Sequence, residues 1–406
     1  MIYGGELMTD LEKYILDGWD KTLRRTDWHE GEVREDDSLW LPYPYTVPCD
    51  GDIFVHLFYW DTYFANRGLL LSGKRDVVKG NLKNFIYMIN KYGHIPNGSR
   101  KRMLNRSQPP FFGMMLSDYY GATGDEEILC RGIGALKREL DFWYDKRTAK
   151  NGLAHYGCDG DSETYIRGYN MYRDRTGIAL DGDVEYMGRN VYAEAESGWD
   201  FNGRFGGKCL EYNAVDLNSL LWFDERLVTN YTGYTKYAEL AEQRRENMIT
   251  LMRAEDGIFY DYSYVENKKS SLISCASFFP YFVGMTSDKK GTDKLLSALE
   301  LDFGLQASEA CEGNFQWGEN NGWAPLHLVA VEGLLRCGRR DDALRIAKKY
   351  VALTEKCFFE TGHLWEKYNV RDGSSEAVGE YGTPKMLGWT AGVYQALKRL
   401  IETQSY

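Results

Sequence analysis

Apolar residues recur at helical spacing along much of the chain. Between Val78 and Ile89 successive apolar positions are one, three or four residues apart, which places them on one face of a helix. The acidic residues Asp125, Glu126 and Glu127 precede a second such pattern and suit a helix N-terminus. The patterns predict about twelve helices, near 8–18, 62–72, 78–89, 111–123, 125–143, 214–229, 237–251, 270–284, 291–301, 323–336, 343–351 and 385–403.

Longer segments without this pattern separate the helices and are rich in Gly, Pro, Asn, Asp, Tyr and Trp. They are 43–58, 93–110, 151–211, 303–322 and 358–383. Such long irregular segments within a domain are usually functional. They recur about once per helical pair, so stacked hairpins would bring them to one end. Convincing strand patterns are few. We therefore predict an all-α fold, an (α/α)6 barrel whose long loops form the active site at one end.

No break in composition marks a domain boundary, so we expect 1–406 to form a single domain. The chain has 49 basic and 60 acidic residues and a formal charge of -11. This balance argues against nucleic acid and against an anionic membrane surface as partners. The first residues contain no basic segment followed by an apolar one, which predicts a cytoplasmic protein. The sequence leaves the oligomeric state open.

Cysteine and histidine spacing gives no metal motif. The eight cysteines and six histidines form no C-x-x-C and no H-x-x-x-H, so we expect no metal and interpret the cysteines as small buried apolar residues. Aromatic residues make up 15% of the chain. That excess indicates either an aromatic core or a pocket that stacks the apolar faces of sugar rings.

Two loop segments place a carboxylate among aromatic residues. Asp200 lies between Trp199 and Phe201, and Glu366 lies in a second aromatic segment. Burial beside aromatic rings raises the pKa of a carboxyl group, as a general acid near neutral pH requires. Two separated carboxylates of this kind are what glycosidic hydrolysis uses. The alternative for Asp200 is a structural ion pair with Arg204.

Other loop segments offer polar groups suited to a hydroxyl-rich ligand. Asp61 interrupts an aromatic run at 57–64, although it could also cap a helix. The segment 104–110 contains Asn, Arg, Ser and Gln ahead of two prolines. A solvated loop is the alternative interpretation of that segment.

Taken together, these segments resemble the trehalases, glycoside hydrolase family 37. The matching motifs are Tyr59-Trp60-Asp61, His94-Ile95-Pro96-Asn97-Gly98, Arg106-Ser107-Gln108-Pro109-Pro110, Glu196-Ser197-Gly198-Trp199-Asp200-Phe201, Asn321-Gly322-Trp323-Ala324-Pro325-Leu326, Glu366-Lys367-Tyr368 and Gly388-Trp389-Thr390. They follow the family's order over about 43–393. The resemblance implies an (α/α)6 barrel and an inverting hydrolase of α,α-trehalose or a related α-glucoside, with no cofactor.

The resemblance also implies roles for individual residues. By position, Asp200 matches the general acid and Glu366 the general base. The positions implied to contact the sugars are Trp60, Asp61, Asn97, Arg106, Ser107, Gln108, Gly198 and Glu380.

The chain departs from the family at several sugar-binding positions. No arginine lies between Pro48 and Trp60, and the family's Arg-Pro-Glu ahead of the general acid has no match in spacing, Glu163 and Arg167 being the nearest residues. Gly318 stands where the family has an aspartate. These losses predict that trehalose is a poorer substrate than another α-linked glucoside. The alternative is that a neighbouring arginine, Arg100, Arg102 or Arg167, restores the contacts.

Two further classes of function remain open from the sequence. Within glycoside hydrolysis, the substrate could be a glucosylated small acid or a short glucan. In a different class, (α/α)6 barrels also support sugar isomerases and epimerases, for which His94 and His363 could supply the acid and base. Sugar binding without turnover is a third alternative.

Overall fold

The computed structural model describes residues 2–3, 6–51, 53–177, 179, 182–313, 315–377, 384–385 and 388–404. Within these ranges the fold is built from helices. They are α1 (Asp10–Lys21), α2 (Tyr59–Leu71), α3 (Arg75–Tyr92), α4 (Phe112–Thr123), α5 (Glu126–Arg147), α6 (Ser162–Thr176), α7 (Val184–Glu196), α8 (Val215–Thr232), α9 (Thr235–Asn247), α10 (Phe279–Phe282), α11 (Thr292–Leu299), α12 (Ala324–Arg336), α13 (Arg340–Thr361) and α14 (Gly388–Thr403). None of these helices is long and apolar enough to cross a membrane.

The strands of the described residues are only two or three residues long. They are β1 (Ile2–Tyr3), β2 (Glu6–Leu7), β3 (Leu23–Arg24), β4 (Tyr45–Thr46), β5 (Tyr212–Asn213), β6 (Tyr262–Ser263), β7 (Lys268–Lys269), β8 (Glu300–Leu301), β9 (Gly304–Leu305), β10 (Asn321–Trp323) and β11 (Lys367–Asn369). All pair antiparallel, and β10 pairs with β11 so that Trp323 lies opposite Lys367.

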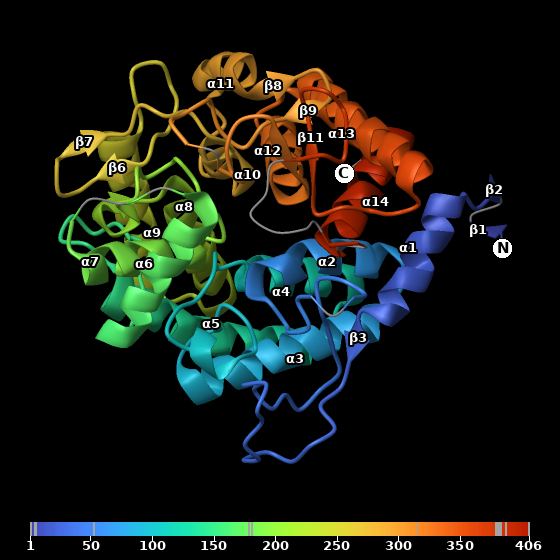
Figure 1. The fold of residues 1–406 in the computed structure, drawn as a ribbon, viewed down its shortest axis with the longest axis horizontal. Coiled ribbons are helices and arrows are strands. Elements are labelled where there is room, and N and C mark those ends of the chain that lie inside the picture. The colour runs from blue at the N-terminus through green and yellow to red at the C-terminus, as the bar shows by residue number, and fades with distance from the viewer. Residues whose placement is uncertain are drawn as a thin grey trace.

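Six helices form a closed inner ring. Each helix contacts the next in the order α2, α4, α8, α10, α12 and α14, and α14 contacts α2, which closes the ring (Figure 1). Helices of this ring are apolar on nearly every side because they are enclosed by neighbours. In α12 the buried residues run without interruption from Ala324 to Leu334.

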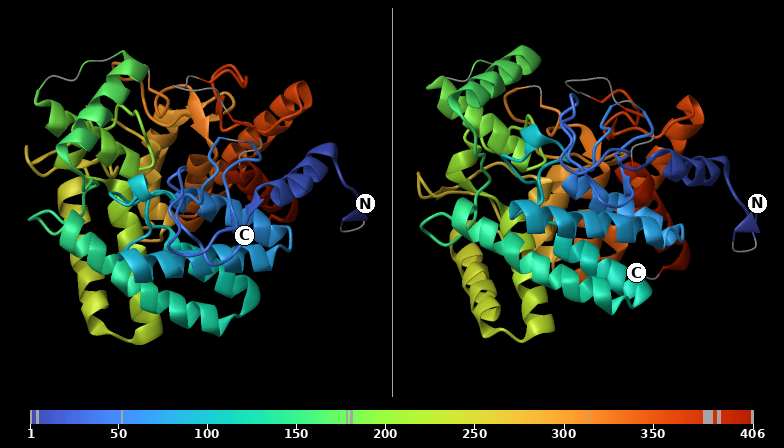
Figure 2. Two further views of the ribbon diagram at one scale, coloured as in Figure 1. Left: turned by 60° about the horizontal axis from the view of Figure 1, so that its bottom comes forward. Right: turned by 90° about the horizontal axis from the view of Figure 1, so that it is seen from below.

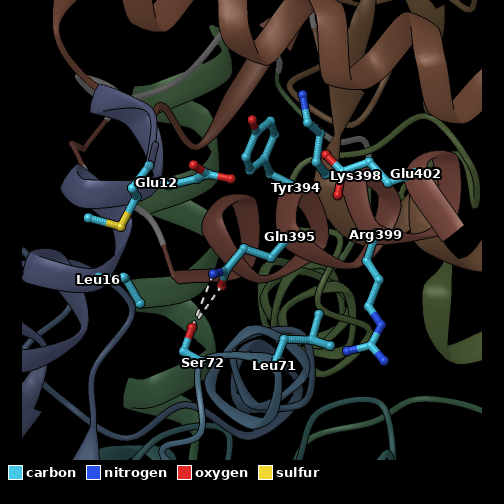
Figure 3. Close-up of a pocket in the computed structure, with 10 residues that line it drawn as sticks. Glu12, Leu16, Leu71, Ser72, Tyr394, Gln395, Lys398, Arg399 and Glu402 are labelled. Carbon is cyan, nitrogen blue, oxygen red and sulfur yellow. Dashed lines mark hydrogen bonds between the residues drawn. The ribbon is translucent and has the colours of Figure 1, made fainter. Parts of the chain in front are cut away.

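A second ring covers the first. α3 packs on α2 and α4, α5 on α4 and α8, α9 on α8, and α13 on α12 and α14, while α11 packs on the short helical turn ahead of α10. α1 lies beside α14, and residues of both helices line a cavity of about 200 Å³ (Figure 3). There Gln395 of α14 donates a hydrogen bond to the Ser72 hydroxyl at the end of α2. The predicted (α/α)6 barrel is therefore confirmed.

The prediction that 151–211 is irregular was wrong, because α6 and α7 lie within it. These helices pack against each other through glycine rather than through an apolar stripe. A Cβ at Gly188 of α7 would come within 1.7 Å of the Tyr165 carbonyl oxygen of α6. The helix predicted at 270–284 is also much shorter than expected, since α10 covers only Phe279–Phe282 after a 3-10 turn.

The long connections gather at one end of the barrel, on the side of the α6–α7 pair (Figure 2). The inner helices α2, α4 and α12 begin at this end, directly after Phe58, Phe111 and Trp323, and α14 begins there at Gly388. The residues that immediately precede or open these helices are therefore held by rigid elements around one point.

The closest helix contact in the inner ring depends on glycine and can be tested. A Cβ at Gly392 of α14 would lie 2.0 Å from the Phe64 carbonyl oxygen of α2. We expect Gly392→Ala to lower the free energy of unfolding by about 1–3 kcal/mol, because the two backbones must separate. Urea unfolding measures this change in the free energy of unfolding. Gly121→Ala in α4, where a Cβ meets no atom within 4 Å, should be neutral or stabilising by about 0.4–1 kcal/mol. Equal effects of the two substitutions would contradict this account.

Candidate active site

A cavity of about 340 Å³ lies where the long loops meet the inner helices. Its lining combines carboxylates, amides, arginines and aromatic rings. The residues are Phe54, His56, Phe58, Trp60, Asp61, Asn97, Arg100, Arg102, Met103, Arg106, Gln108, Arg175, Gly198, Asp200, Gln316, Trp317, Trp323, Glu366 and Trp389. Segments far apart in the sequence thus contribute to one cavity.

Asp200 follows α7 in a tight turn that directs it into this cavity. Gly198 has φ 73° and Phe201 has φ 57°, so two residues near Asp200 adopt left-handed backbone conformations. A Cβ at Gly198 would lie 2.7 Å from the Trp60 ring, which excludes any larger residue there. Phe201 is held in its strained conformation by stacking on Tyr172, with ring centroids 5.4 Å apart. Burial raises the pKa of Asp200 to about 6, although nearby arginines oppose the shift.

Glu366 reaches the cavity from the loop after α13. Its carboxylate is 2.9 Å from the Lys367 ammonium group, and the Lys367 side chain is fully buried. The same ammonium lies 4.8 Å from the centre of the Trp323 ring, opposite it in the β10–β11 pair. The Trp389 indole donates a hydrogen bond of 3.0 Å to the Glu366 backbone carbonyl. Glu366 is therefore fixed by β11 and by the start of α14.

A buried ion pair holds the loop 105–108 against the end of α7. Arg147 of α5 donates two hydrogen bonds to Glu196, of 2.8 Å from Nε and 3.1 Å from Nη2. The backbone N–H groups of Ser107 and Gly157 donate to the same carboxylate at 2.8 and 2.6 Å. Asn97 adds hydrogen bonds of 3.0 Å to the Ser107 and Ala195 carbonyls. Four donors thus converge on one buried carboxylate four residues ahead of Asp200.

A second buried network holds the other side of the Asp200 turn. Arg204 binds Asp261 through Nε at 2.6 Å and Asp216 through Nη2 at 2.7 Å. Its guanidinium also lies 4.9 Å from the centre of the Trp199 ring. The alternative that Arg204 pairs with Asp200 is therefore wrong, and the Asp200 carboxyl is available to the cavity.

Three tryptophan rings and the carboxyl group of Asp61 also line the cavity. Trp317 stacks on Trp323 at 3.7 Å and lies 5.7 Å from Trp60. Burial raises the pKa of Asp61 to about 7. Asp61 is not the helix cap that was one interpretation of it, because α2 is preceded by Phe58 without a side-chain cap.

The structure brings most of the predicted site residues together. Those lining the cavity are Trp60, Asp61, Asn97, Arg106, Gln108, Gly198, Asp200 and Glu366. Ser107 is fully buried outside this lining, and its hydroxyl donates to the Ile95 carbonyl at 2.7 Å. It positions the loop between two lining residues. Glu380 lies outside the described residues.

Several lining residues were not predicted to contact sugar. Gln316, Trp317, Trp323 and Trp389 come from aromatic loop segments whose individual roles the sequence did not indicate. Arg100 and Arg102 do line the cavity, whereas Arg167 does not. Arg175, at the end of α6, was missed altogether. The sequence did not indicate Arg175 because the segment 151–211, which contains it, was interpreted as a loop.

The residues proposed for isomerase chemistry do not line this cavity. The His94 ring stacks on Phe142 at 4.5 Å, and burial lowers its pKa. His363 lies 5.9 Å from Trp365, between ring centroids. Within the described ranges, no three His, Cys, Asp or Glu side chains are grouped so as to hold a metal ion.

An (α/α)6 barrel whose loop-end cavity combines two carboxyl groups with aromatic rings and amides has the features of a glycoside hydrolase. The family model "Trehalase" matches residues 5–401. The chain therefore belongs to the trehalase family.

Individual relatives agree with this assignment. A periplasmic trehalase of Xanthomonas campestris pv. campestris is 33% identical over 98% of this chain and 74% of its own length. Human trehalase is 32% identical over 87% of this chain and 66% of its own length. Among solved structures, the neutral trehalase of Saccharomyces cerevisiae superposes with a TM-score of 0.76, at 26% identity over 89% of this chain and 76% of that one.

The convergence on Glu196 predicts a large loss of stability when its charge is removed. Glu196→Gln would leave the buried Arg147 guanidinium with only the exposed Asp159 as a partner, and we expect the free energy of unfolding to fall by about 3 kcal/mol. Chemical denaturation measures the change. Glu127→Gln on α5 is the matched control, because Glu127 forms an exposed pair with Arg131 and should change stability by less than about 0.5 kcal/mol. A small effect at both positions would show that Glu196 does not hold the loops.

Proposed function

We propose that this member of the trehalase family hydrolyses α,α-trehalose or a related α-glucoside with inversion, using Asp200 as general acid and Glu366 as general base. The observation that carries the proposal is that these two carboxyl groups, the half-buried Asp200 and the buried Glu366, line the same 340 Å³ cavity. In an inverting pair we expect the carboxyl groups to be about 6.5–9.5 Å apart, which leaves room for the attacking water.

The two carboxyl groups have different surroundings that suit different roles. Asp200 is buried beside Trp199, and its raised pKa keeps a proton available for the glycosidic oxygen. Glu366 lies 2.9 Å from the buried Lys367 ammonium, which fixes the position of its carboxylate beside the attacking water. In the reaction, Asp200 protonates the leaving oxygen as its bond to the anomeric carbon breaks. Glu366 takes a proton from the water that attacks the opposite face, so that both carboxyl groups exchange their protonation states.

Arginines from other positions support trehalose as a substrate despite the departures from the family. Arg100, Arg102 and Arg175 line the cavity together with Arg106. A guanidinium group presents several N–H donors that can bind sugar hydroxyls directionally. These residues stand in for the arginines missing between Pro48 and Trp60 and ahead of the general acid.

We also propose that the protein works in the cytoplasm. All eight cysteines carry free thiols in the structure, and six of them are buried. Unpaired cysteines are typical of reducing compartments. The Xanthomonas campestris relative is described as periplasmic, so fractionation of cells that express the native gene would decide between the compartments.

Product configuration tests the mechanism directly. Inverting hydrolysis of α,α-trehalose should release one β-glucose and one α-glucose, because water inverts only the carbon it attacks. Proton NMR during the first minutes of the reaction should therefore show equal amounts of the two anomers. Release of α-glucose alone would indicate retention and would contradict the proposed pair.

Matched variants assign the two roles. Asp200→Asn and Glu366→Gln should each lower kcat by about 10²–10⁴-fold while the protein stays folded, because each change is nearly isosteric. Asp174→Asn, an exposed position on α6 paired with Arg173, should retain full activity. Substantial turnover by either cavity variant would remove that residue from the mechanism.

The surroundings of Asp200 predict a pH dependence. A general acid must be protonated, so kcat/KM should fall as pH rises above about 6. Arg175 lowers the pKa of Asp200, and Arg175→Gln should therefore move this alkaline limb to higher pH. Arg138→Gln, on the surface of α5, should leave the limb in place. If the alkaline limb of the kcat/KM profile stays at the same pH in Arg175→Gln, a group other than Asp200 sets the pH of that limb.

A further inference from the structure

A second cavity, of about 770 Å³, adjoins the catalytic one on the side of Asp200. The two cavities share Arg102, Met103, Arg106, Arg175 and Asp200. Glu366 lines only the first cavity. Asp200 therefore stands at the junction of the two spaces, whereas Glu366 borders only the smaller one.

This arrangement assigns each cavity to one part of the substrate, if Asp200 and Glu366 have the roles proposed above. The sugar that is attacked must lie between the acid and the base, within the space that both line. The leaving group begins at the oxygen that the acid protonates. The larger cavity, which contacts the acid alone, is therefore the site of the leaving group.

The walls of the leaving-group cavity are rich in cations. Lys101, Arg102 and Arg106 come from the loop before α4, and Arg167 and Arg175 from α6. Among the described residues, no carboxylate lies within 4 Å of the side-chain nitrogens of the first three or of Arg167, although the Asp37 carboxylate accepts a hydrogen bond of 2.9 Å from the Arg102 backbone. Arg106 is 8% exposed, and its Nε has no hydrogen-bond partner there. The Arg106 guanidinium donates a hydrogen bond of 2.8 Å to the Asn105 side chain and lies over the Tyr192 ring.

The acidic residues of the same cavity have other partners, although Asp161 also lies near Arg167. Asp159 is 3.3 Å from Arg147 of the Glu196 network. Asp161 caps α6 by accepting a hydrogen bond from the Thr164 backbone at 2.9 Å. Asp200 carries a proton when it acts as the acid. The cations therefore outnumber the carboxylates of this cavity, and since Lys101, Arg102 and Arg167 are exposed, the cavity presents a positive potential that attracts anions.

We propose that the preferred substrate is an α-glucoside whose leaving group bears a phosphate or a carboxylate, bound by Arg106, Arg102, Lys101 and Arg167. Guanidinium groups bind both anions through paired N–H donors. The cavity volume exceeds that of the catalytic space and falls in the usual range of about 300–1,000 Å³ for small-molecule sites, so it has room for a substituted sugar or hydroxy acid.

The test compares three α-glucosides that differ in their leaving groups. Trehalose 6-phosphate offers a phosphorylated sugar, glucosylglycerate offers a carboxylate, and trehalose is the neutral reference. We expect kcat/KM for at least one anionic substrate to exceed that for trehalose by about tenfold or more at low salt. The excess should shrink at about 0.5 M sodium chloride because salt screens partly exposed charges. The better of the two anionic substrates distinguishes phosphate from carboxylate recognition.

Variants outside the catalytic cavity connect the preference to this surface. Arg167→Gln and Lys101→Gln should each reduce the ratio of kcat/KM for the anionic substrate to kcat/KM for trehalose by several-fold, and the double variant by more. Arg138→Gln removes an exposed arginine that lines neither cavity and should leave the ratio unchanged.

The outcomes separate this inference from the proposed function. Hydrolysis of trehalose at a rate equal to or above that of both anionic substrates would overturn the anion preference and leave the proposed function intact. A preference that survives the double variant would overturn the assignment of these residues. Failure to hydrolyse any of the three α-glucosides would overturn the proposed function itself.

Discussion

The Glu196 carboxylate is the contact on which the active site depends. It is fully buried and accepts hydrogen bonds from the Arg147 guanidinium and from the backbones of Ser107 and Gly157. These partners belong to α5, to the loop before α4 and to the segment before α6. A buried charge is tolerated only when it is fully paired, so the three segments must meet at this point. Asp200, Arg106 and Gln108 are aligned as a consequence, because each lies within four residues of a member of the network.

On the opposite side of the cavity, the lining residues are positioned by helix packing rather than by ionic hydrogen bonds. Trp323 and Gly388 stand at the starts of inner-ring helices, and Trp60 is the second residue of α2. Close packing of that ring, with Gly392 against the Phe64 carbonyl, sets where these helices begin. The β10–β11 pair then ties Glu366 to Trp323 through Lys367. Glu366 is thus placed by helix packing and Asp200 by a network of ionic hydrogen bonds.

The sequence predicted the parts of this protein that carry an apolar period or a short motif. The twelve expected helices correspond to α1–α5 and α8–α14, and the matched motifs contain ten of the residues that line the catalytic cavity. α6 was missed because its packing on α7 uses Gly168 and Gly188 in place of an apolar stripe. Its helical signals were local: Asp161 caps the start and Gly177, in a left-handed conformation, ends it.

Some residues line the cavity only because of the way their segments fold in three dimensions, and one sequence could not predict these positions. The positions of Arg100, Arg102 and Arg175 in the cavity depend on how the loop 93–110 and α6 lie over the barrel, which no spacing rule predicts. The hydroxyl of Ser107 shows the reverse case. Its motif implied contact with sugar, whereas the folded loop directs the hydroxyl to the Ile95 carbonyl. A motif identifies the loop, but the buried hydrogen bonds of that loop decide which of its side chains reach the ligand.

The electrostatics of Asp200 connect catalysis with the choice of leaving group. Burial raises its pKa, while Arg106 and Arg175 lower it. The same two arginines line the leaving-group cavity. An anion bound among them would offset their positive charge and weaken their effect on Asp200, so its pKa would rise further. A leaving group that carries a negative charge would thereby keep the general acid protonated at the moment when its proton is needed. Substrate recognition and acid catalysis therefore act through one set of charges.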